Sequence, residues 1–402
     1  MTGVEERTDV AAVEQIDGGV MAPAGFVAGS AIAGLRSTPT PDLAVLAVAD
    51  GPGSAAAVFT RNRFRAAPVL VAEQALAEGG GRVRAVVVNA GCANAGTGPD
   101  GLADAHAVVM ATAERLACAP WEVLPASTGL IGSRLDVAGI ARALGTMRLE
   151  ATAEAGHAAA RSIMTTDTRP KEAAVRVGGI TVGGMAKGSG MIHPDMATML
   201  AVLTTDADAP PELLRDLLRE SATRTFNQVT VDGDTSTNDA VMLLASGRAD
   251  LDTPALAAGI EAVSRSLAQQ VAADGEGAQH RIDVTVRGAR NDAEARDAAR
   301  TIAGSMLVKS AVHGADPNWG RVLAAAGRSG ATLDASRAGL RIGGIEVYDG
   351  APLAFDEEAA SAVLRQPVVP LDLDLRLGDG LGEAWGCDLS AEYVVINSEY
   401  HT

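Results

Sequence analysis

The twenty residues Lys187–Asp206 read KGSGMIHPDMATMLAVLTTD and carry the most information about the fold. Their first half is rich in glycine and contains Pro194, which predicts a tightly turned loop. The run Met199–Leu203 is apolar, a pattern typical of a buried strand. A small residue, Ala197, and then Thr198 stand where the loop meets the strand. The stretch therefore predicts a constrained loop that leads directly into a core strand.

Outward from this stretch, strand and helix patterns follow one another in mixed order. Apolar runs and a Gly178-Gly179 hairpin signal predict strands, and 3.6-residue periodicity predicts helices. Residues 1–18 are interpreted as a polar lead-in, and the C-terminal third as short strands ending with Glu392–Ile396. Layered α/β or α+β architecture is favoured over a doubly wound sheet. The predicted strands are Leu43–Ala49, Arg84–Asn89, Ala173–Met185, Met199–Leu203, Ala240–Ala245 and Arg281–Arg287, and the predicted helices are Leu102–Ala117, Asp136–Leu144, Ala151–Ile163, Pro211–Thr223, Pro254–Ala273 and Asp292–Met306.

Composition excludes several classes of partner. The chain has 402 residues and a formal net charge of −17, with no basic stripe to bind a phosphate backbone or an anionic membrane. The stretch Gly19–Gly34 lacks a preceding basic flank and is broken by glycine and proline, so we expect neither a secretion signal nor a membrane span. Cys92, Cys118 and Cys387 lie far apart and are odd in number. We therefore expect a cytoplasmic enzyme without disulfides or a zinc site.

The junction at Ala197 and Thr198 suits self-cleavage. The Thr198 hydroxyl can attack the Ala197 carbonyl, and water can then hydrolyse the resulting ester. The product carries a free α-amine on the nucleophilic residue itself. Because an α-amine has an unperturbed pKa of roughly 7.7–8, it can serve as a general base near neutral pH. Nucleophile and base would then belong to one residue, as in N-terminal threonine enzymes.

The segment KGSGMIHPDMATML resembles the cleavage-site signature of the ornithine acetyltransferase family, also called glutamate N-acetyltransferase, of arginine biosynthesis. Asp195 replaces the Asn of many members, and His193 falls where the family varies. The likeness extends from about Gly19 to Thr402 and includes, in the family's order, VMAPAGFVAGSAIAGLR, FTRNRFRAAPV, NAGCANAGTG, PASTGLIG, MTTDT-x-PK, TFNQVTVDGDTSTND, DGEGAQH, KSAVHGADPNWGR and the tail INSEYHT.

The resemblance implies a mixed α/β, self-processing sandwich of the N-terminal-nucleophile type. Cleavage between Ala197 and Thr198 would give an α chain, 1–197, and a β chain, 198–402, assembled as a heterotetramer or larger. The implied reaction transfers acetyl from N2-acetyl-L-ornithine to L-glutamate through acetyl-Thr198. No cofactor or metal is implied. Some members of the family also use acetyl-CoA, which makes it a second candidate acyl donor.

The family's functional residues match positions along the whole chain. Thr198 is the implied nucleophile, and the Thr128 hydroxyl with the Gly129 backbone N–H is the implied oxyanion hole. A substrate carboxylate calls for a cation or neutral donors, and the ammonium of acetylornithine calls for a carboxylate such as Glu276. Thr165 is the second choice for the threonine of its turn. The implied substrate-binding residues are Thr166, Lys187, Thr198, Glu276, Asn397 and Thr402.

Several alternatives stay open. A self-processing amidase or aminopeptidase, a relative acting on a specialised metabolite, and an uncleaved amino-acid-binding protein all fit the pattern. The segment Asp316–Arg321 fits a turn that caps the next helix at least as well as a catalytic element. Residues Asp232–Asp239 lack the glycine and glutamate of a calcium loop and are interpreted as a loop supporting the site. A hypothesis that His193 makes maturation pH-dependent also remains.

Overall fold

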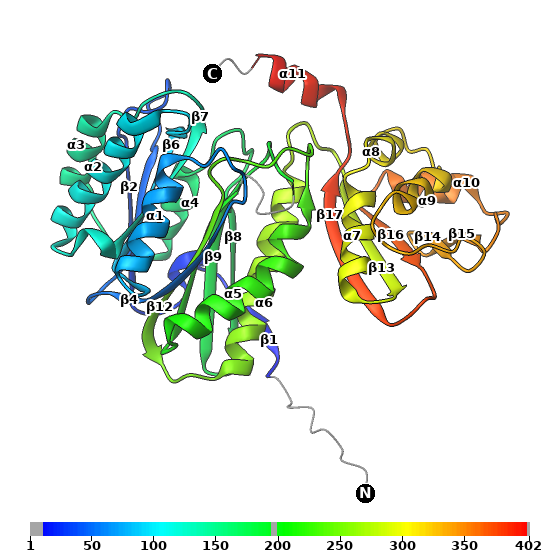
Figure 1. Cartoon of the computed structure of the whole chain (residues 1–402), viewed down its shortest axis with the longest axis horizontal. Coiled ribbons are helices and arrows are strands. Elements are labelled where there is room, and N and C mark those ends of the chain that lie inside the picture. The colour runs from blue at the N-terminus through cyan, green and yellow to red at the C-terminus, as the bar shows by residue number, and fades with distance from the viewer. Residues whose placement is uncertain (1–10, 194–198, 400–402) are drawn as a thin grey trace, which may run out of the picture.

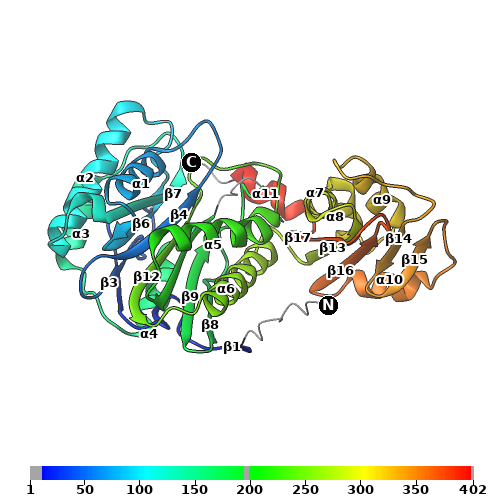
Figure 2. The ribbon, with the colours of Figure 1, turned by 60° about the horizontal axis from the view of Figure 1, so that its bottom comes forward.

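The computed structural model describes residues 11–193 and 199–399. They form two lobes, a large one built on two stacked sheets and a smaller C-terminal one built on a third sheet (Figures 1 and 2). No helix in these ranges combines the length and the apolar character needed to span a membrane. The predicted mixed α/β class is confirmed.

The larger sheet of the large lobe has β10 as its middle strand. β10 pairs with β9 in antiparallel fashion on one side and with β12 in parallel fashion on the other, and all of its residues are buried. The Gly178-Gly179 turn joins β8 to β9, as predicted. In spatial order the seven strands are β1 (Val13–Gln15), β8 (Lys171–Val177), β9 (Ile180–Lys187), β10 (Leu200–Ala207), β12 (Ala240–Ala249), β4 (Gly53–Phe59) and β5 (Arg82–Val83).

A four-stranded sheet stacks on this sheet. Leu46 and Val88 from the smaller sheet share one hydrophobic core with Leu200 and Val202 of β10. Residues of two helices, α1 (Ala67–Glu78) and α4 (Ala153–Ser162), join the same core. The four strands, in spatial order, are β2 (Phe26–Ala31), β3 (Leu43–Val48), β6 (Ala85–Cys92) and β7 (Val123–Leu130).

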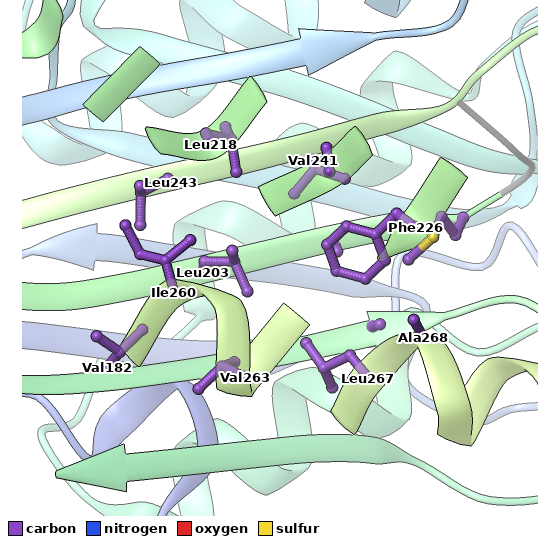
Figure 3. Close-up of a cluster of buried hydrophobic side chains, with 14 of the residues drawn as sticks. Val182, Leu203, Leu218, Phe226, Val241, Leu243, Ile260, Val263, Leu267 and Ala268 are labelled. Atoms are coloured by element: carbon purple, nitrogen blue, oxygen red, sulfur yellow. The ribbon is translucent and has the colours of Figure 1, made fainter. Parts of the chain in front are cut away.

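Helices cover the outer face of each sheet. Side chains of alternate residues in β10, Ala201 and Leu203, belong to a second core on the opposite face, which includes two long helices. Figure 3 shows Leu203 beside Ile260 and Val263 of one of these helices. Because a strand alternates its side chains between faces, burial on both faces requires the continuous apolar run that β10 has. The layers are thus helix, sheet, sheet, helix, with α2 (Gly98–Leu116) and α3 (Val137–Thr146) on one outer face and α5 (Pro211–Arg224) and α6 (Thr253–Ala273) on the other.

The smaller lobe has a mixed sheet with helices packed on it and a hydrophobic core of its own. Val229 of β11 and Trp385 of β17 pack instead in the core beneath α5 and α6 of the large lobe. Short 3-10 turns occur in the large lobe at Gly19–Met21 and Pro120–Glu122, and another at Phe226–Gln228 leads into β11. The small lobe's elements are β11 (Val229–Thr230), β17 (Gly380–Cys387), β13 (Arg281–Ala289), β16 (Val368–Asp374), β14 (Gly339–Ile342) and β15 (Ile345–Asp349), with α7 (Asp292–Ala303), α8 (Met306–His313), α9 (Trp319–Gly327) and α10 (Glu357–Leu364).

Four predictions about the elements are wrong. The expected strand Glu392–Ile396 is part of a helix, α11 (Ala391–Glu399), none of whose residues is buried. An isolated surface segment has no neighbouring strand to pair with, and a helix satisfies its backbone groups internally. The single helix predicted over Asp292–Met306 is two helices, divided at Gly304, and the C-terminal third holds helices as well as strands. The N-terminal lead-in contains β1, which pairs with β8.

Candidate active site

The predicted cleavage sequence forms the connection between β9 and β10. Lys187, the last residue of β9, lies opposite Leu200, the first residue of β10. The amide of Gly188 donates to Asp167 Oδ1 at 2.7 Å, and the amide of Ile192 donates to Asp232 Oδ1 at 2.9 Å. Carboxylates from two other parts of the chain therefore hold the first half of this connection.

The other half of the connection contains the proposed nucleophile. The predicted cleavage residues Ala197 and Thr198 lie outside the described residues, as does the predicted substrate residue Thr402. The next described residue is Met199, whose amide donates to Asp239 Oδ1 at 3.1 Å. The Met199 carbonyl accepts from the Ala240 amide at 3.2 Å. Both backbone polar groups of Met199, the residue directly after Thr198, are thus hydrogen-bonded to residues at the start of β12.

Lys187 is buried beside the site. Its side chain belongs to a residue only 3% exposed, which excludes a solvated surface lysine. Burial lowers the pKa of the Lys187 ammonium, although the negative charges of Asp167, Asp239 and Glu276 favour its charged form. Lys171 acts in the same direction as burial. An incoming carboxylate would shift this balance toward the charged lysine.

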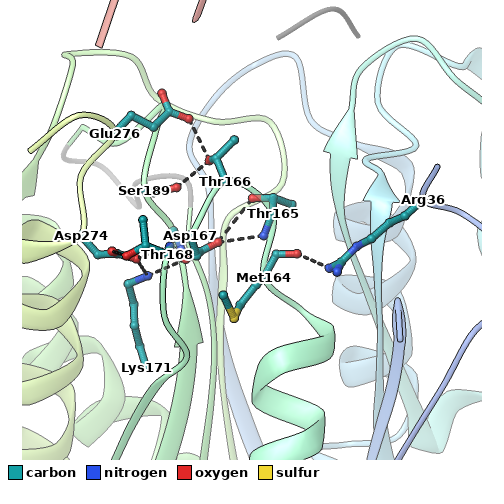
Figure 4. A network of polar contacts seen from close by, with 11 residues as sticks. Arg36, Met164, Thr165, Thr166, Asp167, Thr168, Lys171, Ser189, Asp274 and Glu276 are labelled. Carbon is teal, nitrogen blue, oxygen red and sulfur yellow. Dashed lines mark hydrogen bonds and ion pairs between the residues drawn. The ribbon is translucent and has the colours of Figure 1, made fainter. Parts of the chain in front are cut away.

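Thr166, Glu276 and Asn397 meet in one hydrogen-bond network. The Thr166 hydroxyl donates to Glu276 Oε1 at 2.8 Å and lies 2.6 Å from the Ser189 hydroxyl (Figure 4). The Asn397 amide nitrogen donates to Glu276 Oε2 at 2.8 Å. The Glu276 backbone also docks on the same connection, because its amide donates to the Ser189 carbonyl at 2.8 Å. Three predicted substrate residues from distant parts of the chain are therefore in contact.

A buried ion pair supports this network from below. Lys171 Nζ lies 2.6 Å from Asp167 Oδ1 and 2.6 Å from Asp274 Oδ2, and all three side chains are almost fully buried (Figure 4). Burial alone would raise the pKa of Asp167, but the charges of Lys187 and Lys171 hold it well below its ordinary value. The Thr168 amide also donates to Asp274, at 3.1 Å. These contacts fix the turn that presents Thr166.

The same turn distinguishes Thr166 from Thr165. The Thr165 amide donates to Asp167 Oδ2 at 2.9 Å, and its hydroxyl lies 3.5 Å from the same oxygen. Thr165 also lines a separate cavity of about 860 Å³, together with Arg36 and His157. Of these two threonines, Thr166 is the one that bonds to Glu276, so the geometry favours Thr166 as the substrate-facing threonine.

The predicted oxyanion residues lie at the end of β7. Thr128 is 5% exposed, and Gly129 has a φ of +125°, which side-chain-bearing residues rarely adopt. A Cβ at Gly129 would lie 2.4 Å from the carbonyl carbon of Gly91 on the neighbouring strand. The peptide before Thr128 is held by Asn238, whose amide nitrogen donates to the Ser127 carbonyl at 2.9 Å.

Comparison with known proteins decides the family. The ArgJ family model matches residues 27–402. The chain belongs to the ArgJ family. It is 50% identical over 403 residues to the arginine biosynthesis bifunctional protein ArgJ of Dehalococcoides mccartyi, covering 96% of this chain and 98% of that protein. It is also 50% identical over 384 residues to the ArgJ protein of Thermus thermophilus, covering 95% and 100%. The resemblance to ornithine acetyltransferases is thereby confirmed.

Two solved structures of the family are also similar. The crystal structure of the Bacillus halodurans ArgJ protein is 42% identical, covers 49% of this chain and 97% of that chain, and has a TM-score of 0.48. The structure of Mycobacterium tuberculosis ornithine acetyltransferase complexed with ornithine is 41% identical, covers 46% of this chain and 98% of that chain, and has a TM-score of 0.41.

Other ArgJ motifs in this chain have structural explanations. Asn318 precedes α9, as a capping turn predicts, but its side chain makes no capping hydrogen bond. Trp319 of the same motif packs against Tyr348, with ring centroids 5.2 Å apart. His193 Nδ1 lies 3.1 Å from the Thr230 hydroxyl.

Within residues 11–193 and 199–399, no group of three histidine, cysteine or acidic side chains is arranged to hold a metal.

Sequence reasoning missed the residues that hold the site together. Lys171, Asp274 and Asn238 were inside motifs that carry the family resemblance, yet spacing along the chain gave them no role. Their partners lie about one hundred residues away, as in the ion pair between Lys171 and Asp274. The interpretation of the Asp232–Asp239 region as a supporting loop agrees with its contacts to Ile192, Met199 and β7.

Proposed function

We propose that this chain transfers an acetyl group from N2-acetyl-L-ornithine to L-glutamate through an acetyl-Thr198 intermediate, after cleaving itself between Ala197 and Thr198. Membership of the ArgJ family supports this proposal. The observation that carries it is the meeting of Thr166 and Glu276 beside the β9–β10 connection. That connection holds the cleavage sequence, so substrate-binding groups and nucleophile belong to one location.

Maturation proceeds in two balanced steps. The Thr198 oxygen attacks the Ala197 carbonyl carbon, the peptide C–N bond breaks, and the hydroxyl proton passes to the departing nitrogen. Water then hydrolyses the ester, which returns the Thr198 hydroxyl and leaves a carboxyl group on Ala197. The net change is addition of one water across the peptide bond. The new α-amine can act as general base near neutral pH, because its unperturbed pKa is roughly 7.7–8.

Acetyl transfer then follows a ping-pong course. The amine takes the proton of the Thr198 hydroxyl while the oxygen attacks the acetyl carbonyl of acetylornithine. The Thr128 hydroxyl and Gly129 N–H donate to the developing oxyanion, which lowers the barrier. Ornithine leaves as its α-amine takes up the proton. The α-amine of glutamate attacks the acetyl ester by the same steps in reverse, which gives N-acetylglutamate and restores Thr198.

Two charged side chains explain the choice of substrates. Lys187 is assigned to the α-carboxylate that donor and acceptor share, since it is a buried cation beside the cleavage loop. Glu276 is assigned to the side-chain ammonium that only acetylornithine carries, with Thr166 and Asn397 holding its two oxygens. This division lets one site accept both amino acids in turn.

The large sheet explains how the cut fragments stay together. Strands β10 and β12 belong to the proposed β chain, 198–402, and lie between β9 and β4 of the proposed α chain, 1–197. Each pairs with an α-chain strand through backbone hydrogen bonds. Burial of each large side chain of β10, such as Leu203, contributes about 1.5–3 kcal/mol. We propose that the fragments remain one αβ unit, assembled into a heterotetramer or larger in the cytoplasm.

A second activity is proposed with acetyl-CoA as acyl donor for glutamate. The names of the curated relatives state that those proteins are bifunctional, which favours a second reaction over a single exchange. Both reactions would use the same acetyl-Thr198 ester. Incubating the enzyme with glutamate and acetyl-CoA in the absence of acetylornithine tests it directly: N-acetylglutamate forms if the second donor is accepted.

One experiment separates the proposed transferase from its alternatives. Denaturing electrophoresis of the 40.7 kDa chain should give two bands near half its mass, and Thr198→Ala should give one. The cleaved protein is then incubated with acetylornithine, with and without glutamate. N-acetylglutamate formation supports transfer, whereas free acetate supports an amidase. A single band that binds amino acids without turnover supports an uncleaved binding protein.

A further inference from the structure

Asp239 is a buried carboxyl group with one oxygen that lacks a partner. It directly precedes β12 and is 1% exposed. Its Oδ1 accepts the hydrogen bond from the Met199 amide at 3.1 Å, whereas Oδ2 has no hydrogen-bond partner among the described residues. Buried polar atoms in proteins almost always have a partner. An exception of this kind points to a group that arrives in another state of the protein.

The missing group is identified by covalent geometry. The backbone nitrogens of Thr198 and Met199 are three bonds apart, so they lie no more than roughly 3.7 Å from each other. The Met199 nitrogen is already fixed by Asp239 Oδ1. In the uncut chain the Thr198 nitrogen is an amide with a single hydrogen. After cleavage it is an amine or ammonium, with hydrogens that did not exist before.

We propose that Asp239 receives the α-amino group that cleavage frees at Thr198, with Oδ2 accepting one of its hydrogens. The inference rests on the proposed function, because the amine exists only once the Ala197–Thr198 bond is cut. The carboxyl proton of Asp239 passes to the amine, which gives a carboxylate and an ammonium without an external acid or base. Loss of one ammonium proton to solvent then gives the free amine that acts as general base, so Asp239 is a positioning residue that holds this amine.

Among the described residues, Lys187 is the charged group that acts on Asp239. Burial raises the pKa of this carboxyl group well above its ordinary value, and the Ser236 hydroxyl, the Met199 amide and the Lys187 ammonium oppose that shift. The Ser236 hydroxyl is near enough to act on the carboxyl group but forms no hydrogen bond with Oδ2. Lys187 belongs to β9 and is shared with Asp167 and Glu276, so it does not neutralise Asp239 alone. An ammonium at Thr198 would supply a second positive charge for Asp239 beside the shared charge of Lys187.

The turn that carries Asp239 also positions the oxyanion donors. The neighbouring side chain, Asn238, donates to the Ser127 carbonyl at 2.9 Å and to the Ala93 carbonyl at 2.7 Å. The peptide before Thr128 and the amide after Thr198 are therefore held by adjacent residues. One short segment of the chain therefore fixes the proposed oxyanion donors relative to the start of β10. Acyl transfer requires such fixed relative positions of the reacting groups.

The test is the pH dependence of kcat/KM for acetylornithine, measured on cleaved Asp239→Asn. This change retains an oxygen for the Met199 amide but replaces the second oxygen with an NH₂ donor. Because the ammonium loses its carboxylate partner, its pKa falls, and the acidic limb of the profile moves to lower pH by about 1–3 units. The maximal rate also falls, since the amine is no longer oriented. An acidic limb identical to that of the wild type overturns the proposal.

A matched control lies at the far end of β10. Asp206 is also a buried carboxylate, 8% exposed, and its Oδ1 accepts the Thr181 amide at 2.8 Å. Asp206→Asn is expected to leave the acidic limb unchanged. If cleaved wild type transfers acetyl while Asp239→Asn keeps its limb, this inference fails and the proposed function stands. An uncut wild type that transfers acetyl at full rate contradicts the proposed function itself.

A second variant covers the case in which Asp239→Asn does not accumulate as folded protein. Asp239→Glu keeps the negative charge but moves it by one methylene. We expect its acidic limb to stay near that of the wild type while kcat falls at least tenfold, because the ammonium is held in the wrong place. A kcat equal to that of the wild type would show that the position of this carboxylate does not matter.

Discussion

Replacing Glu276 with glutamine removes one negative charge and little else. The Thr166 hydroxyl and the Asn397 amide nitrogen each lie 2.8 Å from a Glu276 oxygen. The glutamine oxygen can accept from Asn397, and its NH₂ group can donate to the Thr166 hydroxyl, which is able to accept. We therefore expect the free energy of unfolding to change by less than about 1 kcal/mol. The effect on activity then reports the charge.

The size of that effect follows from the strength of charged hydrogen bonds. Bonds to charged groups contribute about 1.5–3 kcal/mol, against about 0.5–1.5 kcal/mol for neutral pairs. Losing the charge opposite the acetylornithine ammonium therefore costs about 1–1.5 kcal/mol. Since each 1.4 kcal/mol is a factor of ten, kcat/KM for acetylornithine should fall roughly five- to tenfold. Glu276 is partly exposed, so salt in the assay should reduce the effect.

The assay compares the two directions of the reaction. Acetylornithine is the donor in one direction and N-acetylglutamate, which has no ammonium, is the donor in the other. Glu276→Gln should lower kcat/KM for acetylornithine and leave that for N-acetylglutamate unchanged or improved. Glu220→Gln, on the exposed face of α5, is the control that should change neither. Equal losses for both donors would refute the assignment of Glu276 to the ammonium.

Three further variants and one control variant test the supports of the site. Lys171→Met removes the cation that pairs directly with the buried Asp167 and Asp274, although the charge of Lys187 still acts on Asp167, so the free energy of unfolding should fall by about 3–5 kcal/mol in urea titrations; an unchanged midpoint would contradict the ion-pair role. A Cβ in Gly190→Ala would lie 2.4 Å from the Glu276 carboxyl carbon, so KM for acetylornithine should rise while KM for N-acetylglutamate changes little. In Gly129→Ala the new Cβ would lie 2.4 Å from the backbone of Gly91, so this variant should show no measurable transfer. Gly145→Ala, in α3, is the control: its new Cβ has open space, so the protein should fold and gain up to about 1 kcal/mol of stability.

Acid should weaken the support beneath Thr166 in a defined direction. Asp167 has a folded-state pKa below that of the unfolded chain, where aspartate titrates near 3.9. Its contribution to stability is therefore fully present above the unfolded value and is lost as pH falls toward the folded one. In the wild type, the urea concentration at the midpoint of unfolding should decrease once the pH is below roughly 4. This acid dependence should be smaller in Asp167→Asn.

Much of the large lobe could be predicted from local patterns. The apolar run after Thr198 predicted a buried strand, and β10 is buried on both faces in the middle of its sheet. Local patterns gave the wrong secondary structure where an apolar segment is exposed rather than buried. The apolar pattern of Glu392–Ile396 predicted a strand, but Val394 is 64% exposed and the segment is helical. Hydrophobic sequence alone does not tell whether a neighbouring strand is available.

The site was predictable as a set of residues but not as a set of contacts. The resemblance to a known family named Thr166, Glu276 and Asn397, and the structure brings the three together. The buried pair of Lys171 with Asp274 could not be predicted, because no periodicity links residues so far apart. Such pairs exist only once the chain has folded, and they are the parts that position the site.

The most direct test of the account is the mass of each fragment after the enzyme meets its donor. Purified protein is mixed with acetylornithine in the absence of glutamate, quenched in acid and analysed by mass spectrometry. The account predicts two fragments, 1–197 and 198–402. The second fragment carries one acetyl group on residue 198, and adding glutamate removes that acetyl group. An intact polypeptide that turns over at full rate, or an acetyl group found on the first fragment, would contradict it.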